Sequence, residues 1–373
     1  MKIGILTFHC AHNYGAVIQC YGLQQYLKSL GHEVCVIDYR PQYFDFYKIF
    51  KVTISNSSNF KTYLKGKIRE LIIGNVQKRR FHAFEDFIEQ KLHLVPYIEN
   101  YDYSDYDAVI LGSDQIWNPN ITGGNYDEEF FGSNAKCKII SYAASSKSLC
   151  LTEEQKDYFK SHLPKIDSIS VRETSLKNQL QPLTSQPIAT VIDPSLLPDV
   201  SVYDDLCSPI KHKRPYVLVY EVKRHEDTYR FAKEIAQSLD ADVIELLSGV
   251  SYNLLNKNLI QSGGPIEFLS YIKNATCVVT TSFHGMALSL KFQKDFYSLR
   301  QGTNADLRAE SLLTKIGMLE RFVPLSSSVK FSKIDYTKYS ANLVSEISHS
   351  KDFITNSLND DLTSQNLHYS PCL

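Results

Sequence analysis

The first forty residues alternate between an apolar strand, a helix and a second apolar strand. Residues 2–7 form a continuous apolar run, residues 16–30 form an amphipathic helix that Gly31 ends, and residues 32–39 return as an apolar run. A strand–helix–strand unit of this length joins two parallel neighbours of one sheet. Because similar units recur along most of the chain, the sequence predicts an α/β fold with parallel sheets.

The alternation covers two segments that a weaker pattern separates. With 373 residues the chain exceeds the size at which a single hydrophobic core stops growing, so two domains are expected. The separating segment contains prolines and a basic run, which is typical of a linker. We predict an N-terminal domain over residues 1–197, a linker over 198–215, a C-terminal domain over 216–345, and a terminal helix and tail over 346–373 that pack back on the N-terminal domain.

Composition narrows the class of ligand and the compartment. Forty Lys and Arg residues oppose 41 Asp and Glu residues, so no overall field attracts nucleic acid, and any anionic ligand must be held by local arginines. The eight cysteines contain no C-x-x-C pair and are interpreted as reduced thiols. No apolar run approaches the roughly 20 residues that a bilayer crossing needs. We expect a cytoplasmic protein without a nucleic-acid partner, and a peripheral membrane contact stays open.

One histidine stands where a predicted strand gives way to a helix. Residues 275–290 read A-T-C-V-V-T-T-S-F-H-G-M-A-L-S-L, and Gly285 follows the histidine at the start of the helix. Such turns at the carboxyl edge of a parallel sheet are where ligands bind. His284 can exchange protons near neutral pH. This segment alone supports a catalytic histidine and a structural helix cap equally.

A polar loop follows the first strand. Residues 7–16 read T-F-H-C-A-H-N-Y-G-A, and Asn13, Tyr14 and Gly15 precede a helix, where free N–H groups and side-chain amides suit oxygen-rich ligands. The loop lacks the G-x-G-x-x-G spacing, so a dinucleotide site is disfavoured. His9 and His12 have no third partner nearby, and we predict no metal site.

A second polar loop follows a buried strand. It reads G-S-D-Q-I-W-N-P and contains Ser113, Asp114, Gln115, Trp117 and Asn118. A polar cluster beside the single Trp is typical of a loop that contacts sugar or phosphate. The alternative is that Asp114 caps the next turn.

An arginine ends a further predicted strand. Arg172 lies in S-V-R-E-T-S, directly before a predicted helix start. A guanidinium there can fork onto a phosphate or carboxylate while the helix end adds partial positive charge. A simple ion pair with Glu173 is disfavoured, because adjacent side chains of a strand point to opposite faces.

Seven motifs together resemble the polysaccharide pyruvyl transferase family. They occur in the family's order over nearly the whole chain: N-Y-G-A-V-I-Q-C-Y-G-L (13–23), G-S-D-Q-I-W-N-P (112–119), Y-A-A-S (142–145), S-V-R-E-T-S (170–175), V-I-D-P-S-L-L (191–197), T-T-S-F-H-G-M-A-L-S (280–289) and A-D-L-R-A-E-S-L-L (305–313).

The resemblance implies a fold and a reaction. The fold would be GT-B-like, with two Rossmann-like domains facing across a cleft. The reaction would transfer the pyruvyl group of phosphoenolpyruvate onto a hexose of a bacterial capsule or exopolysaccharide, forming a cyclic ketal and releasing phosphate. The family's acceptor is often carried on a polyprenyl diphosphate at the inner face of the cytoplasmic membrane. No metal or organic cofactor is implied.

The resemblance also implies site residues. The family's motif histidine corresponds to His284 and its phosphate-binding arginine to Arg172, with the C-terminal domain on the donor side and the N-terminal loops on the acceptor side. Relatives often read R-L-H-G at the histidine turn, whereas this chain reads S-F-H-G, so Ser282 replaces an arginine. We predict that Arg308 supplies the missing charge, with Arg300 as the alternative. Ser282 and Gly285 are placed beside the donor.

Two other functions stay open at this point. A GT-B glycosyltransferase that uses a nucleotide sugar would share the architecture. A non-catalytic glycan-binding relative would retain the fold without turnover, and the departure at Ser282 keeps this alternative open.

Overall fold

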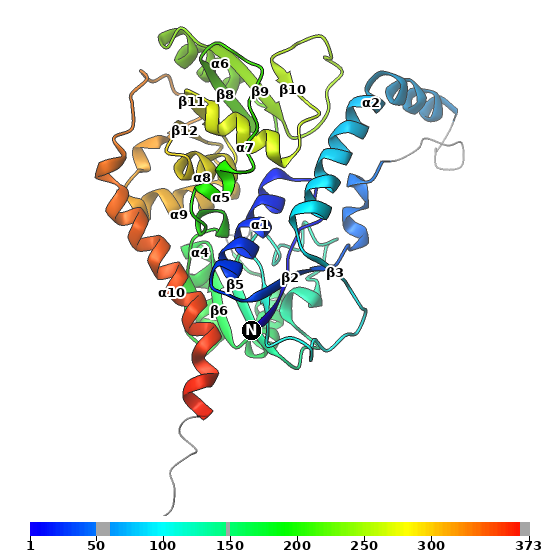
Figure 1. The fold of residues 1–373 in the computed structure, drawn as a ribbon, viewed down its shortest axis with the longest axis vertical. Helices are drawn as coiled ribbons and strands as arrows, with labels where there is room; N and C mark the ends of the chain where they lie inside the picture. Colours follow the sequence, from blue (N-terminus) through cyan, green and yellow to red (C-terminus); the bar gives the residue numbers. More distant parts are fainter. Residues whose placement is uncertain (50–59, 147–149, 366–373) are drawn as a thin grey trace, which may run out of the picture.

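Two parallel sheets form the body of the protein (Figure 1). The computed structural model describes residues 1–49, 60–146 and 150–365, with side chains described up to residue 359. Within this part of the chain, the first sheet has the strand order β3-β2-β1-β4-β5-β6-β7 and the second the order β10-β9-β8-β11-β12-β13. All neighbouring strands run parallel. The α/β fold with two Rossmann-like sheets is confirmed.

The bounds of the strands in the first sheet are β1 (Lys2–Leu6), β2 (Glu33–Asp38), β3 (Leu94–Pro96), β4 (Ala108–Leu111), β5 (Lys138–Ala144), β6 (Ser168–Val171) and β7 (Ile188–Thr190). Those in the second sheet are β8 (Tyr216–Glu221), β9 (Asp242–Leu247), β10 (Leu259–Ile260), β11 (Cys277–Thr280), β12 (Asp295–Arg300) and β13 (Phe322–Pro324).

The helices are α1 (Tyr14–Ser29), α2 (Phe60–Lys91), α3 (Glu153–His162), α4 (Thr174–Leu180), α5 (Ser201–Asp204), α6 (Glu226–Ser238), α7 (Pro265–Asn274), α8 (Phe283–Lys291), α9 (Leu307–Ile316) and α10 (Ser340–Gln365). Two short 3₁₀ helices, η1 (Gln42–Tyr47) and η5 (Pro194–Leu196), follow β2 and β7 in the chain. Among the described helices, none is both long and apolar enough to cross a membrane.

The strand order creates one crevice in each sheet. In the first sheet the chain runs outward in opposite directions from β1 and β4, and in the second from β8 and β11. Ligands of open α/β sheets bind at the carboxyl ends of strands where the order reverses. The loops after β1, β4, β8 and β11 are therefore the positions at which this fold can build a site.

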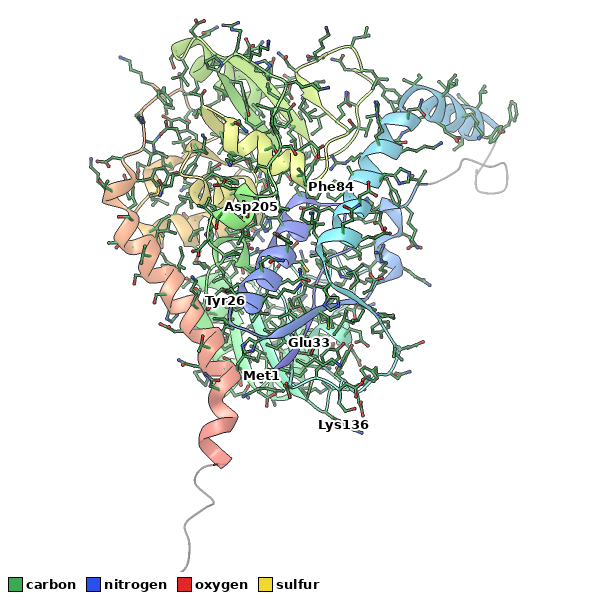
Figure 2. All side chains as sticks on the ribbon, in the orientation of Figure 1. Met1, Tyr26, Glu33, Phe84, Lys136 and Asp205 are labelled. Carbon is green, nitrogen blue, oxygen red and sulfur yellow. The ribbon has the colours of Figure 1, made fainter. Side chains whose placement is uncertain are left out.

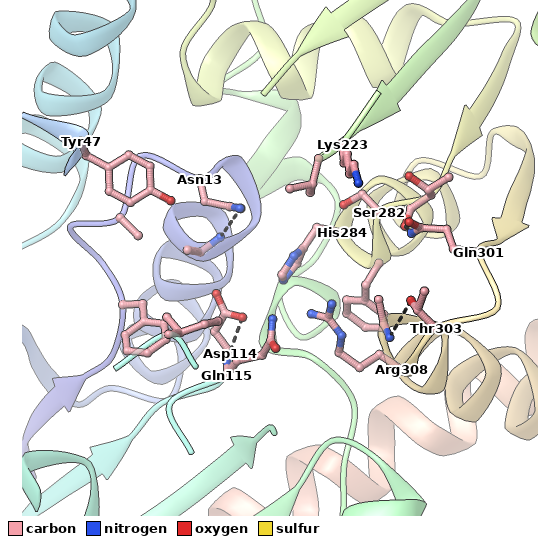
Figure 3. A pocket seen from close by; sticks show the side chains of 18 of the residues that line it. Asn13, Tyr47, Asp114, Gln115, Lys223, Ser282, His284, Gln301, Thr303 and Arg308 are labelled. Carbon is pink, nitrogen blue, oxygen red and sulfur yellow. Dashed lines mark hydrogen bonds between the residues drawn. The ribbon is translucent and has the colours of Figure 1, made fainter. Parts of the chain in front are cut away.

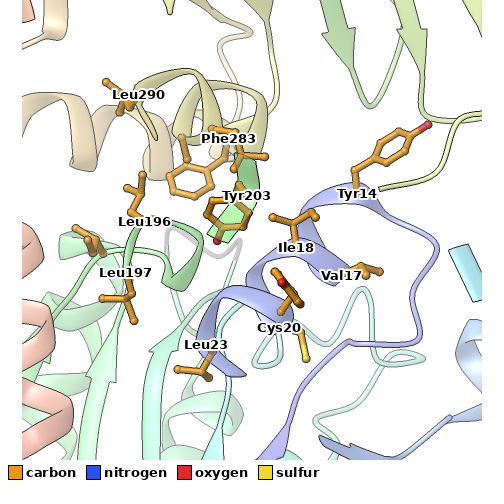
Figure 4. Packing of buried hydrophobic residues seen from close by; sticks show 14 of the residues in the cluster. Tyr14, Val17, Ile18, Cys20, Leu23, Leu196, Leu197, Tyr203, Phe283 and Leu290 are labelled. Atoms are coloured by element: carbon orange, nitrogen blue, oxygen red, sulfur yellow. The ribbon is translucent and has the colours of Figure 1, made fainter. Parts of the chain in front are cut away.

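A continuous apolar core joins the two sheets. Residues from both, such as Ile3 of β1 and Val278 of β11, belong to one cluster of buried side chains. Figure 4 shows its centre, where Ile18 of α1, Leu196 of η5 and Phe283 of α8 lie close together with Tyr203 of α5. Removing this apolar surface from water fixes the two sheets against each other.

The C-terminal helix contacts both halves. The Ile192 N–H donates to Ser350 Oγ over 3.0 Å, and the Phe353 ring lies near the ring of Tyr142 in β5. Glu346 forms a 2.9 Å ion pair with Lys315 of α9. Residues 366–373 of the predicted tail lie outside the described residues, and the exact domain boundaries stay a prediction.

Candidate active site

A cavity of about 510 Å³ opens where the two crevices face each other (Figure 3). Its wall combines residues that follow β1, β4, β8, β11 and β12 with Tyr47 of η1. The polar residues that line it are Asn13, Tyr47, Asp114, Gln115, Lys223, His225, Thr281, Ser282, His284, Gln301, Thr303 and Arg308. Both sheets therefore contribute to one pocket.

His284 lies at the first turn of α8, on the wall of this pocket. The helix begins there because Ser282 adopts an extended backbone and its Oγ accepts a hydrogen bond from the Gly285 N–H. The imidazole is 5% exposed, and its Nε2 lies 3.3 Å from Asp193 Oδ2. A carboxylate at this distance orients the ring from the Nε2 side.

Gly15 lets the two halves meet at this histidine. A Cβ built on Gly15 would overlap the His284 ring, with Nδ1 as its nearest atom. Gly15 lies in the first turn of α1, which Asn13 caps by accepting from the Gly15 N–H over 2.9 Å. The N-termini of α1 and α8 therefore approach each other closely because this residue has no side chain.

Asp193 connects the histidine to the first sheet. Its Oδ2 accepts from Arg172 Nη1 over 2.6 Å and from Ser113 Oγ over 3.2 Å, and its Oδ1 accepts from the Ser195 N–H. Burial alone would raise the pKa of Asp193, but the interactions with His284 and Arg172 outweigh it and hold the pKa well below its usual range. Asp193 is thus a fully buried carboxylate beside the imidazole.

Sequence reasoning did not assign Asp193 to the site. The residue lies in the V-I-D-P-S-L-L motif, directly before the proline that begins η5. Asp193 and His284 are far apart in the sequence, so their pairing could not be predicted from spacing. The packing of η5 against α8 brings the two residues together. The signal available in the sequence was an acidic residue at the end of a strand segment, before a helix start.

Arg172 lies behind the pocket rather than on its wall. It is 4% exposed, and its guanidinium stacks on the Phe283 ring at 4.8 Å. Three carboxylates surround its guanidinium. The nearest nitrogen-to-oxygen distances are 2.6 Å to Asp193, 3.6 Å to Glu173 and 3.8 Å to Asp114. Its predicted contact with a donor phosphate stays a prediction, and this position favours a role in holding Asp193.

The expectation that Arg172 and Glu173 would point apart is wrong. Strand β6 ends at Val171, so strict alternation no longer applies at these two residues. Glu173, the residue before α4, is instead a buried carboxyl that accepts from Ser145 Oγ. Burial raises the pKa of Glu173.

Arg308 and Arg300 lie in different surroundings. Arg308, in the first turn of α9, lines the pocket and has no ion-pair partner within 4 Å among the described residues. Burial and the nearby charge of Arg172 lower the pKa of Arg308, while the carboxylates of Asp114, Glu173 and Asp193 act in the opposite direction. Arg300 lies 3.5 Å from Glu310, packs on Phe322 and does not line the pocket.

The predicted polar loops reach the pocket only in part. Asn13, Asp114, Gln115 and Ser282 line it, as predicted. Asp114 has a φ of 81°, a strained conformation of the kind that collects at functional sites. The remaining predicted loop residues, which do not line it, are Tyr14, Gly15, Ser113, Trp117, Asn118 and Gly285.

Trp117 is not a sugar-contact residue. Its side chain is fully buried, stacks on Phe131 and donates from Nε1 to the Phe130 carbonyl over 2.9 Å. Asn118 is also buried and donates to Gln115 Oε1. Of the polar neighbours that suggested a sugar contact, Asp114 and Gln115 line the pocket, while the indole points into the core of the first sheet.

Tyr14 joins the two halves. Its hydroxyl donates to the Gly263 carbonyl over 2.8 Å, and its ring stacks on Phe268 of α7. Arg80 of α2 lies over the ring and contacts its hydroxyl. Gly285 is equally structural, because a Cβ there would overlap Thr280 Oγ1.

Several pocket residues were not predicted. Lys223 and His225 follow β8, and Gln301 and Thr303 follow β12. The basic run V-K-R-H directly after the β8 strand was the available signal, since it stands at a carboxyl edge. In the part of the chain that the structure describes, no group of three or more His, Cys, Asp or Glu side chains is arranged to hold a metal ion. His9 instead pairs with Asp38, and His12 with Glu85.

Comparison with known proteins identifies the family. The sequence profile of the polysaccharide pyruvyl transferase family matches residues 13–303. Of the four strands that flank the two crevices, this range includes β4, β8 and β11 but not β1. The chain belongs to this family. No curated protein matches it significantly.

Solved structures of similar shape are distant. The MnaA–UDP co-structure from S. aureus is 11% identical, covers 97% of each chain and has a TM-score of 0.46. A UDP-N-acetylglucosamine 2-epimerase from Rickettsia bellii is 12% identical, covers 99% of this chain and 96% of its own, and has a TM-score of 0.45. ADP-heptose lps heptosyltransferase II from E. coli is 11% identical, covers 93% and 99%, and has a TM-score of 0.42. At these scores the description of the fold rests on this chain's own topology.

Proposed function

We propose that this protein transfers the pyruvyl group of phosphoenolpyruvate onto two hydroxyls of a hexose, forming a cyclic ketal and releasing phosphate. The observation that carries the proposal is the pairing, on one pocket wall, of a histidine held beside a carboxylate with an arginine that forms no ion pair within 4 Å among the described residues. Membership of the polysaccharide pyruvyl transferase family supports the substrate class.

The charges of the pocket suit a small dianionic donor. Phosphoenolpyruvate carries a phosphate and a carboxylate, and a planar guanidinium can bind either one through two parallel hydrogen bonds. Arg308 can take this role, and Lys223, on the loop after β8 of the same sheet, supplies a second positive charge. Ser282 lies between them on the pocket wall, and its hydroxyl can donate a hydrogen bond to phosphoenolpyruvate (Figure 3).

His284 is placed to move protons. In the first step the donor's methylene carbon takes a proton and becomes a methyl group, and a sugar hydroxyl adds to C2 as it loses its own proton. The C2–O bond to phosphate then breaks, phosphate leaves with the bonding electrons, and the second hydroxyl closes the ketal with loss of its proton. General acid–base catalysis by one such group contributes typically 10²- to 10⁴-fold.

In this proposal Asp193 and Arg172 hold His284 in position for proton transfer. The carboxylate fixes the ring from the Nε2 side and stabilises the imidazolium that forms when Nδ1 takes a proton. Arg172 in turn holds the carboxylate ionised and in place. This arrangement needs no metal or organic cofactor.

The acceptor is assigned to the other side of the pocket. Asn13, Asp114 and Gln115 belong to the first sheet and offer amide and carboxylate groups that bind sugar hydroxyls. Tyr47 adds an aromatic ring on the same side. We place the hexose there, carried on a polyprenyl diphosphate at the cytoplasmic face of the membrane.

Product analysis tests the proposal. The protein is incubated with phosphoenolpyruvate and lipid-linked glycan fractions, and products are followed by mass spectrometry and by phosphate release. Phosphate release that depends on the glycan, together with a pyruvylidene group on the product, is expected. Transfer of a hexose from a nucleotide sugar, with no reaction of phosphoenolpyruvate, would overturn the proposal in favour of a glycosyltransferase.

A further inference from the structure

The N-terminal part of α2 presents an apolar stripe that no described residue covers. Phe60, Leu64, Ile68 and Leu71 follow one another at spacings of four, four and three residues, which places them on one face of the helix. Each is between 49% and 86% exposed. A run of large exposed apolar side chains of this kind marks an interaction surface.

This part of the helix stands away from the body. In Figure 1 the first turns of α2 extend beyond the two sheets, and Phe84, labelled in Figure 2, is buried where the helix reaches the rest of the protein. We call residues 60–72 of α2 the arm. Its stripe is not required for the packing of the core.

Basic side chains flank the stripe. Lys61 and Lys65 lie along one edge, and Lys67 lies along the other. The arm carries four basic residues and one carboxylate, Glu70, which pairs with Lys67 over 2.9 Å. The chain as a whole has a formal charge of only -1, so this positive charge is local.

We propose that the arm docks on an anionic lipid bilayer. Helices that lie in a membrane interface combine an apolar stripe with flanking Lys and Arg, so that the stripe enters the acyl boundary while the charges meet acidic headgroups. A second copy of the chain suits the surface less well, because pairing two arms would bring their basic edges together. Lipid headgroups supply the complementary charge.

The arm lines a cavity that adjoins the candidate pocket. A second cavity of about 510 Å³ lies between α2 and residues 248–250, and Lys48, Arg69 and Lys78 on its lining extend the positive surface. Tyr47 lines both this cavity and the candidate pocket. The inference itself does not depend on the proposed reaction.

Vesicle co-sedimentation tests the arm. Vesicles of phosphatidylcholine alone and with phosphatidylglycerol are compared at low and high salt. We expect binding to the anionic vesicles only, weakened by salt. Lys61→Glu/Lys65→Glu should weaken binding to the anionic vesicles about tenfold or more, because each basic residue near an acidic membrane contributes about 1 kcal/mol to binding. Leu64→Ser/Leu71→Ser should reduce it by a similar factor.

Matched controls separate the arm from general surface effects. Leu255→Ser changes a side chain that is 93% exposed elsewhere, and Lys330→Glu/Lys333→Glu makes the same charge change on the second half. Both should bind vesicles like the wild type. Failure of the wild type to bind anionic vesicles, or equal binding by the arm variants, would overturn the proposal. Dimerisation that the Leu64→Ser/Leu71→Ser variant abolishes, without vesicle binding, would show that a second copy is the occupant.

Discussion

At the scale of single residues, the candidate site depends on how closely His284 is surrounded. Asp193 holds one ring nitrogen from the first half, and Gly15 leaves just enough room for the other. Arg308 brings a positive charge to the pocket wall. Each of these relations can be tested by a substitution that leaves the core intact.

Gly15→Ala should damage activity more than stability. The added methyl group would overlap the His284 ring and displace it, so we expect kcat to fall by about tenfold or more. Alanine also favours a helix over glycine by about 1 kcal/mol, which offsets part of the steric cost. Gly74→Ala in α2 is the control, because the Cβ added there would meet no atom nearer than Glu70 Cγ at 3.6 Å. If Gly15→Ala and the wild type had equal kcat, the close approach of Gly15 to His284 would not matter for turnover.

His284→Asn should remain folded, bind donor and lose turnover. Asparagine can make local hydrogen bonds at a helix start but cannot exchange protons, so kcat should fall by about 10² or more with little change in donor affinity. Steady-state kinetics and thermal melting would be measured together. A folded variant with near-normal kcat would return His284 to a purely structural role.

At the scale of elements, α8 and η5 form the contact that builds the site. Lys291, the last residue of α8, donates from Nζ to the Leu196 carbonyl of η5 over 3.1 Å. Burial lowers the pKa of Lys291 to about 8. The same packing carries Asp193, which precedes η5, to His284 at the other end of α8.

Lys291 makes this contact sensitive to pH. The unfolded chain, with a lysine pKa of about 10.4, binds more protons than the native state above about pH 8. The stability of the wild type relative to Lys291→Met should therefore rise from about pH 8 to about pH 9.5. Denaturant titrations at several pH values measure it, and Lys333→Met, at an exposed position, should show no such trend. A constant difference between wild type and Lys291→Met would contradict the lowered pKa.

Elements were easier to predict from the sequence than the site. Strands such as β1 and β11 are continuous apolar runs, and helices such as α1 end at glycine, so local patterns were sufficient. The edge strands β3, β10 and β13 were missed because two or three residues carry no periodicity.

The site residues show a different limit. His284 and Asn13 were found because strand ends meet at one edge of a parallel sheet. The pairing of Asp193 with His284 and the burial of Trp117 depend on how distant segments pack, which neither spacing nor residue type reveals.

At the scale of the whole molecule, the two halves are joined by polar as well as apolar contacts. Arg80 of α2 is 7% exposed and donates to the carbonyls of Leu247, Ser248 and Gly263 in the second half. Its guanidinium also lies over the ring of Tyr14, whose hydroxyl donates to the Gly263 carbonyl. These contacts join α1 and α2 of the first half to the second half.

Arg80→Met should destabilise the protein as one cooperative unit. A hydrogen bond from a charged group contributes about 1.5–3 kcal/mol, and the variant removes the Arg80 donor from one buried and two partly buried carbonyls. We expect a single unfolding transition with a lower Tm, because one core spans both sheets. The neighbouring, exposed Arg79 provides the control, and Arg79→Met should melt like the wild type. Two separate transitions in Arg80→Met would show that the halves unfold independently.

The central claim is that the pocket binds phosphoenolpyruvate through Arg308 beside His284. Calorimetric titration with phosphoenolpyruvate and, separately, with a nucleotide sugar tests it most directly. The account predicts saturable binding of phosphoenolpyruvate that Arg308→Lys and Arg308→Gln weaken by roughly 10- to 10²-fold and that Arg300→Gln leaves unchanged. Binding of the nucleotide sugar with no binding of phosphoenolpyruvate, or wild-type affinity in Arg308→Gln, would contradict it.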